Sequence, residues 1–290
     1  MSVEVASDIV CECGEGAVWS VDTGTLLYVD IPGCTVYEYD PAGPSQSWLL
    51  DSPIGCVAVH ESGGIVVALP DGYHLLDRES GDVSPLAILD HPDPRQRFND
   101  GAVDSEGRFW AGTMLTNAPE PERIGRVWRL GAEGIDGPFF DPLYTANGMA
   151  FSPDGKRMYL SDSHPDLQTV WVFDYDPDTG QPSNGRVFVD MHSMAGRPDG
   201  AAVDSEGCYW IACVGGGEIA RFDPMGRLDR LLPVPVAKPT KVAFGGRDMS
   251  TLYITSMSGD GSGPDGRLLA IDVDVPGIAV DAVTGNLGSG

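Results

Sequence analysis

Asn99 to Gly112 reads Asn-Asp-Gly-Ala-Val-Asp-Ser-Glu-Gly-Arg-Phe-Trp-Ala-Gly, and the chain repeats this pattern about a hundred residues later. The second copy, Arg197 to Ala212, reads Arg-Pro-Asp-Gly-Ala-Ala-Val-Asp-Ser-Glu-Gly-Cys-Tyr-Trp-Ile-Ala. In each copy an acidic residue precedes a short apolar stretch, and Asp-Ser-Glu-Gly separates that stretch from an aromatic one. Two such stretches around a Gly-containing turn predict a β-hairpin, which we take as the repeating unit.

Related segments recur along the whole chain. Six of them begin at Gly16, Gly55, Gly101, Gly148, Gly200 and Lys241, 39 to 52 residues apart. This spacing suits units of four short strands better than a helical or leucine-rich repeat. Third strands are indicated by short runs rich in β-branched and aromatic residues, such as Val36-Tyr-Glu-Tyr-Asp. Fourth strands are expected at 47–50, 86–89, 187–189 and 230–234.

Six units of four strands predict an all-β, six-bladed β-propeller as a single domain over residues 1–283. The sixth unit runs short after Asp274, and a propeller must close its ring. We therefore expect the Val3–Val10 segment to pair as a strand in the last blade. The Gly-rich residues 284–290 are expected to form a flexible tail.

The chain is strongly acidic, with 43 Asp and Glu against 18 Lys and Arg and a formal charge of -25. This balance argues against nucleic acid and anionic membranes as partners, because phosphates would need clustered Lys or Arg. No apolar run approaches the roughly 20 residues that span a bilayer, and no signal peptide is recognised at the N-terminus. We expect a cytoplasmic protein, a monomer or weak dimer, with six reduced cysteines.

One position of the repeat carries polar side chains that could form a functional site. Residues that directly precede the innermost strands of a propeller should meet at one mouth of its channel. In the six units they are Glu15, Ile54, Asp100, Asn147, Asp199 and Thr240. Carboxylates that converge without a basic partner repel each other, and a bound cation relieves the repulsion. Asp-Gly and Asn-Gly are also common turn dipeptides, but their recurrence on one face favours a site for a hard divalent ion.

Other recurring residues are assigned to structure. The acids of the opposite turns, among them Asp104 and Asp204, are expected to lie in solvent. Trp110 and Trp210 occupy matching strand positions and are expected in the core between blades. The chain carries no Gly-x-Ser-x-Gly elbow, phosphate loop, His-Glu-x-x-His or dinucleotide fingerprint, so serine nucleophiles and nicotinamide chemistry have no support.

The motifs resemble those of the regucalcin (SMP-30), gluconolactonase and luciferin-regenerating-enzyme group of six-bladed propellers. They are Gly14-Glu-Gly-Ala-Val-Trp, Arg97-Phe-Asn-Asp-Gly-Ala-Val-Asp, Ala111-Gly-Thr-Met, Ala146-Asn-Gly-Met-Ala-Phe-Ser-Pro-Asp-Gly-Lys, Tyr159-Leu-Ser-Asp-Ser and Pro198-Asp-Gly-Ala-Ala-Val-Asp. They span nearly the whole chain, and their order makes the resemblance specific.

The resemblance implies one divalent cation, Ca²⁺, Mg²⁺, Mn²⁺ or Zn²⁺, held by Glu15, Asn147 and Asp199. It also implies substrate contacts by Arg97 and Asn99, with Asp100 nearby. Members often carry a substrate-binding Glu shortly after Gly-Thr-Met, where this chain has Leu-Thr-Asn. Asn117 is therefore the candidate contact at this place, and the sugar specificity stays open.

The leading hypothesis is metal-dependent hydrolysis of a sugar lactone, such as glucono-, galactono-, xylono- or arabinono-lactone, to the aldonic acid. Asp199 is the candidate catalytic residue, as metal ligand and as general base for the attacking water. Asn147 is neutral and can only be a ligand. Two alternatives remain: another metal-dependent esterase or phosphotriesterase at the same site, and a non-catalytic calcium-binding propeller.

Overall fold

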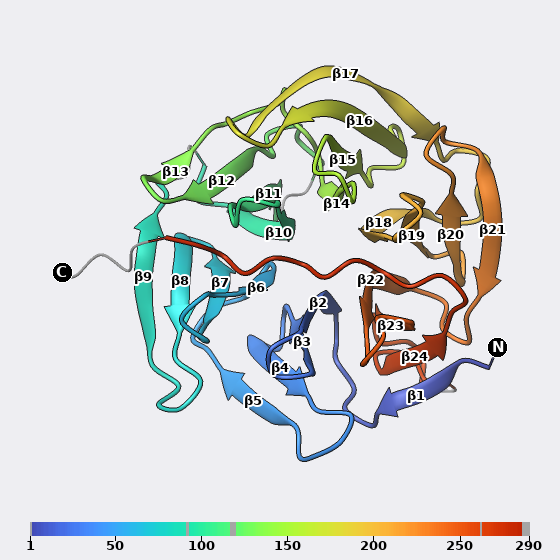
Figure 1. The fold of residues 1–290 in the computed structure, drawn as a ribbon, viewed down its shortest axis with the longest axis horizontal. Coiled ribbons are helices and arrows are strands. Elements are labelled where there is room, and N and C mark those ends of the chain that lie inside the picture. The colour runs from blue at the N-terminus through green and yellow to red at the C-terminus, as the bar shows by residue number, and fades with distance from the viewer. Residues whose placement is uncertain (1, 91–92, 117–119, 262, 286–290) are drawn as a thin grey trace.

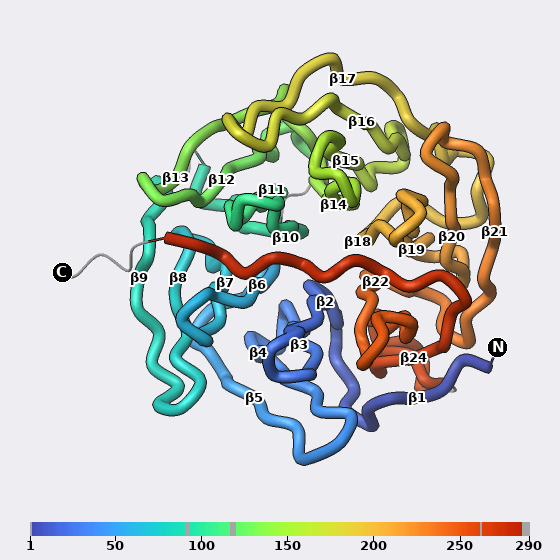
Figure 2. Tube along the Cα trace, in the orientation of Figure 1, coloured from blue at the N-terminus to red at the C-terminus, as the bar shows by residue number. Residues whose placement is uncertain are grey.

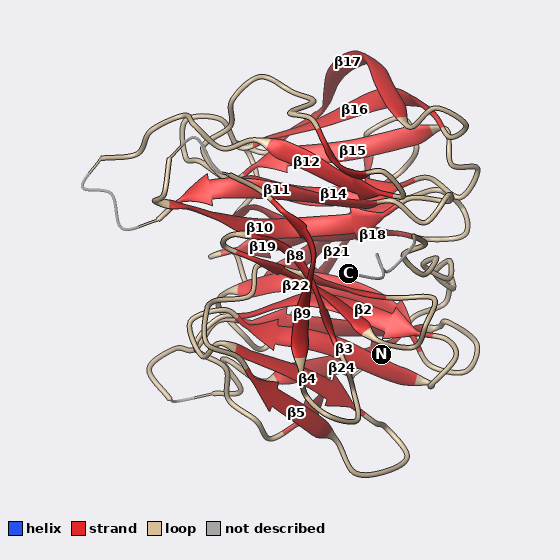
Figure 3. Cartoon of the chain, turned by 90° about the vertical axis from the view of Figure 1, so that its left-hand side faces the viewer, coloured by secondary structure: helices blue, strands red, loops and turns tan. Residues whose placement is uncertain are grey.

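The computed structural model describes residues 2–90, 93–116, 120–261 and 263–285. Six antiparallel sheets of four strands are arranged in a ring, as Figure 1 shows. In the side view of Figure 3 the sheets stack around the ring with loops at both ends of the strands. The predicted six-bladed propeller is confirmed. Within the described ranges, no helix is long and apolar enough to cross a membrane.

Blades 1 to 3 follow the chain from the innermost strand outward. Blade 1 contains β2 (Gly14–Ser20), β3 (Thr25–Asp30), β4 (Thr35–Tyr39) and β5 (Gln46–Leu49). Blade 2 contains β6 (Val57–Val59), β7 (Ile65–Leu69), β8 (Gly72–Leu76) and β9 (Val83–Ile88). Blade 3 contains β10 (Gln96–Val103), β11 (Phe109–Leu115), β12 (Val127–Gly131) and β13 (Gly134–Asp136). The predicted fourth strands of blades 1 and 2 are present, and β13 is one that the sequence pattern did not indicate.

Blades 4 to 6 complete the ring. Blade 4 contains β14 (Ala146–Phe151), β15 (Arg157–Asp162), β16 (Thr169–Asp176) and β17 (Gln181–Asp190). Blade 5 contains β18 (Arg197–Val203), β19 (Tyr209–Val214), β20 (Glu218–Phe222) and β21 (Leu228–Pro233). Blade 6 contains β22 (Pro239–Gly245), β23 (Thr251–Ser256), β24 (Leu268–Asp272) and, as its outer strand, β1 (Glu4–Ser7). β1 pairs antiparallel with β24 through Glu4 and Ala270, so the predicted closure by the N-terminal strand is confirmed.

Aromatic side chains join neighbouring blades. Trp110 and Trp210 are 0% and 1% exposed, as expected for core residues. The Trp110 ring lies 4.5 Å from the Phe139 ring and 5.9 Å from the Tyr175 ring of blade 4. Burying a large side chain of this kind contributes about 2–3 kcal/mol. These contacts pack blade 3 against blade 4.

The innermost strands share an irregularity near the end at which they begin. In blades 1, 3, 4, 5 and 6 the pairing with the second strand slips by one residue there, a β-bulge. Aligning the blades by this bulge gives three levels along the channel. Glu15 and Asn147 share the first level, Asn99 and Asp199 the second, and Asp100 and Lys241 the third.

The assumption that the acids before the repeat starts occupy equivalent positions is therefore wrong by one or two residues. Gly16 and Gly148 lie within their bulges at a φ of 61°, a left-handed conformation that favours glycine. Gly101 follows its bulge instead, level with Val18. The glycines used to align the repeats thus mark different levels of the channel. Asp100 consequently lies deeper than Glu15 and Asp199.

The segment 275–285 crosses the ring at the end of the channel where the innermost strands finish (Figures 1 and 2). Its backbone bonds to several blades: Ser205 N donates to Pro276 O, Glu61 N to Val283 O, and Thr284 N to Gly107 O. We call this end the far end and the opposite end the mouth. Thr284 is anchored at the far end, and residues 286–290 of the expected tail lie outside the described residues.

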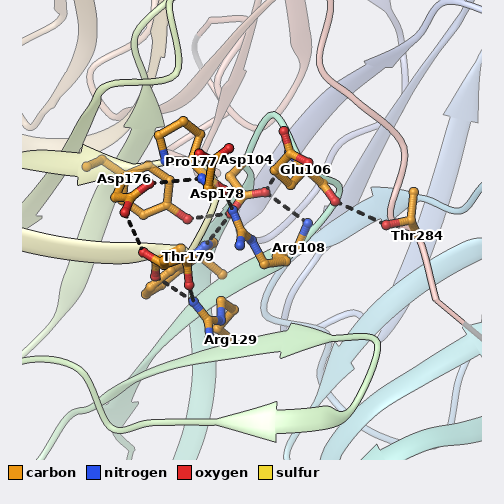
Figure 4. A network of polar contacts seen from close by, with 12 residues as sticks. Asp104, Glu106, Arg108, Arg129, Asp176, Pro177, Asp178, Thr179 and Thr284 are labelled. Atoms are coloured by element: carbon orange, nitrogen blue, oxygen red, sulfur yellow. Dashed lines mark hydrogen bonds and ion pairs between the residues drawn. The ribbon is translucent and has the colours of Figure 1, made fainter.

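The far-end acids Asp104 and Asp204 are not in solvent, which corrects the sequence-based expectation. They are 1% and 0% exposed. Asp104 accepts hydrogen bonds from Arg108, Trp110 and Tyr175, and Figure 4 shows it at the centre of a polar network between two blades. Tyr175 of blade 4 donates to Asp104 of blade 3, whereas the donors to Asp204 come from its own blade, so both carboxylates serve the structure.

Candidate functional site

Glu15 and Asp199 bring two carboxyl groups together at the mouth. Both are buried, at 7% and 8% exposed, and their side chains lie within hydrogen-bonding contact of each other. Burial, with the charge of Asp100, raises the pKa of Glu15 to about 7. Burial and the Glu15 charge raise the pKa of Asp199 well above its usual range. A proton or a cation must therefore compensate this pair.

Asn147 is held beside the pair by its neighbours. Its Nδ2 donates to Ser163 Oγ at 2.6 Å, which leaves Oδ1 on the other side of the amide. That Oδ1 accepts a bond from Asn99 Nδ2 at 2.9 Å. Ser163 Oγ in turn lies 2.5 Å from Pro198 O, next to Asp199. This chain of contacts ties blade 4 to blade 5 and fixes the amide oxygen of Asn147.

Arg97 continues the same network. Its Nη1 donates to Asn99 Oδ1 at 2.9 Å and to Phe98 O at 2.7 Å. Burial lowers the pKa of this guanidinium, which stays far above neutral pH. The structure thus connects Arg97, Asn99 and Asn147 directly. Asn117, the fourth candidate substrate contact, lies outside the described residues.

Asp100 lies below this network and forms an ion pair with Lys241 across the channel. Lys241 Nζ is 2.6 Å from Asp100 Oδ1, and Asp100 Oδ2 accepts a bond from Met149 N at 2.9 Å. The two residues are 2% and 5% exposed. Burial favours the neutral form of Lys241, but the Asp100 carboxylate outweighs this effect and raises its pKa above the ordinary value.

The acids at the mouth therefore have a basic partner, contrary to the sequence-based assumption that they have none. Lys241 begins the sixth repeat and is one of three lysines in the chain. The rarity of lysine in the sequence could have drawn attention to Lys241. Only the geometry of the ring shows that Lys241 lies opposite Asp100. With Asp100 neutralised by Lys241, the charge that remains uncompensated belongs to Glu15 and Asp199.

The donor atoms available at the mouth fit a hard divalent cation. They are the carboxylates of Glu15 and Asp199 and the amide oxygen of Asn147, all oxygen ligands of the kind that Ca²⁺, Mg²⁺ and Mn²⁺ prefer. In the described part of the chain, no group of three or more His, Cys, Asp or Glu side chains is arranged to hold a metal. An ion at the mouth would thus need the neutral Asn147 as its third protein ligand, with water in the remaining positions.

A cavity of about 190 Å³ fills the channel between the Asp100–Lys241 pair and the far end. Its walls are mostly small and apolar, including Ala17, Met149 and Ala201. Residues 278–281 of the crossing segment form part of its lining. Glu15, Asn147 and Asp199 do not line it. The candidate ligands at the mouth therefore lie outside the lining of the apolar channel interior.

These features define a class: a six-bladed propeller with a buried oxygen-rich site at one mouth of its channel. Comparison with known proteins supports the same assignment. The model of the SMP-30/gluconolactonase/LRE-like region matches residues 13–258. The chain belongs to this family.

Curated relatives cover nearly the whole chain. Regucalcin from Xenopus laevis is 38% identical over 261 residues, which are 88% of this chain and 87% of that protein. A 6-deoxy-6-sulfogluconolactonase from Pseudomonas putida is 38% identical over 275 residues, 92% and 93% of the two chains. Among solved structures, a calcium-binding regucalcin from Agrobacterium tumefaciens superposes with a TM-score of 0.91 at 26% identity, covering 98% of this chain and 97% of its own.

Proposed function

We propose that this protein hydrolyses a sugar lactone to its aldonic acid at the mouth, in a reaction that depends on a divalent cation. The observation that carries the proposal is the buried Glu15 and Asp199 pair beside Asn147, which needs a counter-charge. Membership of a family that includes gluconolactonases, and the lactonase name of the Pseudomonas putida relative, support the choice of reaction.

The residues divide the work as follows. A cation held by Glu15, Asn147 and Asp199 would supply Lewis-acid polarisation of the lactone carbonyl. Asp199 accepts the proton of the attacking water, because a carboxylate can bind a cation through one oxygen and accept a proton on the other. Asn147 cannot accept that proton. The hydrogen bond from Asn147 Nδ2 to Ser163 Oγ holds the amide oxygen of Asn147 in place as a ligand.

Arg97 and Asn99 orient the sugar. Arg97 spends Nη1 on Phe98 O and Asn99 Oδ1, so the guanidinium is fixed while its other N–H groups stay available. Donors of this kind suit the hydroxyl and ring oxygens of a lactone. Holding the ring in one orientation beside Asp199 is itself a rate effect, since it replaces a random encounter by a fixed approach.

A second candidate function is cation binding without turnover. It is favoured by the regucalcin relatives and by the description of the Agrobacterium tumefaciens structure as a calcium-binding protein. The same oxygen ligands serve either function. The two candidate functions differ in whether Asp199 activates a water molecule that attacks a bound ester.

Acid release from a panel of aldonolactones distinguishes them. Chelated protein is assayed with and without Ca²⁺, Mg²⁺, Mn²⁺ or Zn²⁺, against spontaneous hydrolysis, while calorimetry measures metal affinity in parallel. We expect metal-dependent turnover that is lost in Asp199→Ala. Tight metal binding with no turnover of any lactone would support the second candidate, and turnover of a simple aryl ester alone would support another esterase.

A further inference from the structure

Two buried aspartates occupy equivalent positions beside two of the proposed cation ligands. Asp30 is the last residue of β3 and Asp162 is the last residue of β15. Each aspartate pairs with the residue directly before the ligand, which is Glu15 in blade 1 and Asn147 in blade 4. The two blades therefore place a carboxylate at the same position relative to a ligand.

The hydrogen bonds of the two aspartates also follow one pattern. Each carboxylate accepts backbone N–H bonds from the residues three and two positions before the ligand, the first on Oδ2 and the second on Oδ1. The donors are Glu12 (2.9 Å) and Cys13 (3.0 Å) for Asp30, and Tyr144 (2.8 Å) and Thr145 (3.2 Å) for Asp162. Hydrogen bonds to an ionised carboxylate are among the stronger ones in proteins. We call each set of two bonds a carboxylate clamp.

The clamp occurs only in the blades that carry a ligand at the first level of the channel. The bulge alignment places Met114, Val214 and Met257 at the corresponding positions of blades 3, 5 and 6. None of these side chains carries a carboxylate. A clamp needed for the geometry of the ring alone would be expected in every aligned blade. Its restriction to the blades of Glu15 and Asn147 links it to the ligands.

The β-bulge explains why these ligands need a second anchor. Directly after Glu15 and Asn147 the pairing with the second strand slips, so the ladder is interrupted on that side. The backbone on the other side must then fix the ligand. There the clamp is completed by a bond from Ser163 N to Thr145 O at 3.2 Å, and blade 1 has the equivalent bond from Ile31 N to Cys13 O at 3.1 Å.

We propose that Asp30 and Asp162 are positioning residues for the cation site: Asp30 holds Glu15 in place, and Asp162 holds Asn147. The inference rests on the cation site of the proposed function and adds two residues to it. Both aspartates act through the backbone and not as ligands. Outer partners of metal ligands typically change metal affinity by about 10–100-fold when they are mutated.

Calorimetry on chelated protein tests the inference without a lactone, using whichever of Ca²⁺, Mg²⁺, Mn²⁺ and Zn²⁺ binds most tightly. Asp30→Asn and Asp162→Asn each replace one acceptor oxygen by an amide nitrogen, and we expect each to weaken binding by about tenfold or more. Asp204→Asn is the matched control, because Asp204 is also buried and accepts backbone bonds from Glu206 and Cys208 at the far end. It should lower the melting temperature but change the Kd by less than about twofold.

A double-mutant cycle separates positioning from a general loss of structure or charge. In Glu15→Gln a carboxylate ligand is already lost, so adding Asp30→Asn should weaken binding much less than it does in the wild-type background, whereas adding Asp162→Asn should keep its effect. Equal losses from Asp30→Asn in both backgrounds would overturn the inference. Asp30→Ser and Asp162→Ser, whose hydroxyl keeps one acceptor oxygen, serve where an Asn variant does not fold.

Lactone turnover by the wild-type protein is measured in parallel, so the inference and the proposed function can fail separately. Metal binding that weakens in both variants, without hydrolysis of any lactone, upholds the inference and rejects the lactonase function. Turnover by the wild-type protein with an unchanged Kd in both variants rejects the inference alone. Absence of binding of all four cations to the wild-type protein rejects the cation site and the inference with it.

Discussion

Asp199 and Asp204 belong to the same blade, five residues apart, and lie at opposite ends of the channel. Both are buried. Asp204 accepts four hydrogen bonds, from the backbone of Glu206 and Cys208 and from Trp210 and Arg221. Asp199 shares a bond with Glu15, another acid. At the far end the protein satisfies its carboxylates, and at the mouth it leaves them in need of a partner.

Whether a buried carboxylate has enough hydrogen-bond donors distinguishes a structural acid from a candidate site residue better than the residue type does. Four donors around Asp204 use the hydrogen-bonding capacity of both carboxylate oxygens and pin two hairpins together. Two acids in contact at the mouth cost free energy in the absence of a cation or proton. Binding sites often retain such unfavourable arrangements, because the ligand supplies the missing interaction.

The largest effect is expected from Asp199→Asn, which preserves shape but removes the proton acceptor. We expect kcat at saturating metal to fall by roughly 10²–10⁴-fold, the usual contribution of a general base. Initial rates of acid release measure this, with metal affinity checked by calorimetry. Near-normal turnover with metal bound would exclude Asp199 as the base.

The next effect concerns the ion pair beneath the mouth. Lys241→Met leaves Asp100 buried without its cation, and breaking such a pair costs about 3–5 kcal/mol of unfolding free energy. The double variant Asp100→Asn/Lys241→Met removes both charges and should recover part of that loss. Denaturant unfolding of the three proteins measures the difference. A double variant no more stable than Lys241→Met would show that packing rather than charge is lost.

At the far end, Asp204→Asn should reduce stability by about 1–3 kcal/mol, because an amide nitrogen would face donors such as Arg221 or Trp210. The kcat of the folded enzyme should stay within about twofold of wild type, because the residue lies outside the mouth. Thermal unfolding and initial rates, run on the same preparation, test both statements. A selective loss of kcat would mean that the two ends are coupled.

The smallest effect is a pH dependence of the chelated protein. The pKa of Glu15 is raised from 4.5 to about 7, so the folded state binds its proton more tightly than the unfolded state. The stability contributed by this group is present below about pH 4.5 and is lost as the pH rises through about 7. The melting temperature of chelated protein should fall over that interval relative to Glu15→Gln. Equal pH profiles for the two proteins would contradict the shift.

The propeller could be predicted because its signals are local. Strand periodicity and Asp-Ser-Glu-Gly turns are read within a dozen residues, and closure by the N-terminal strand follows from a missing fourth strand in the last unit. The candidate ligands Glu15, Asn147 and Asp199, which stay a prediction, could be proposed for a related reason. Each lies in a short motif at the start of an innermost strand.

The remaining features depend on distances between blades, which the sequence does not encode locally. The bulges set how deep each side chain lies, and they place Asp100 opposite Lys241, 141 residues away in the chain. The burial of Asp104 depends in part on Tyr175 from the next blade. A pattern search along one strand could not detect any of these relations.

The segment 275–285 that crosses the far end also has a kinetic consequence. Residues 278–281 line the cavity at the far end, so we expect substrate and product both to use the mouth. In the proposed reaction, the aldonate would then leave through the opening by which the next lactone arrives. Reaction progress curves should therefore bend as acid accumulates, with the product acting as a competitive inhibitor.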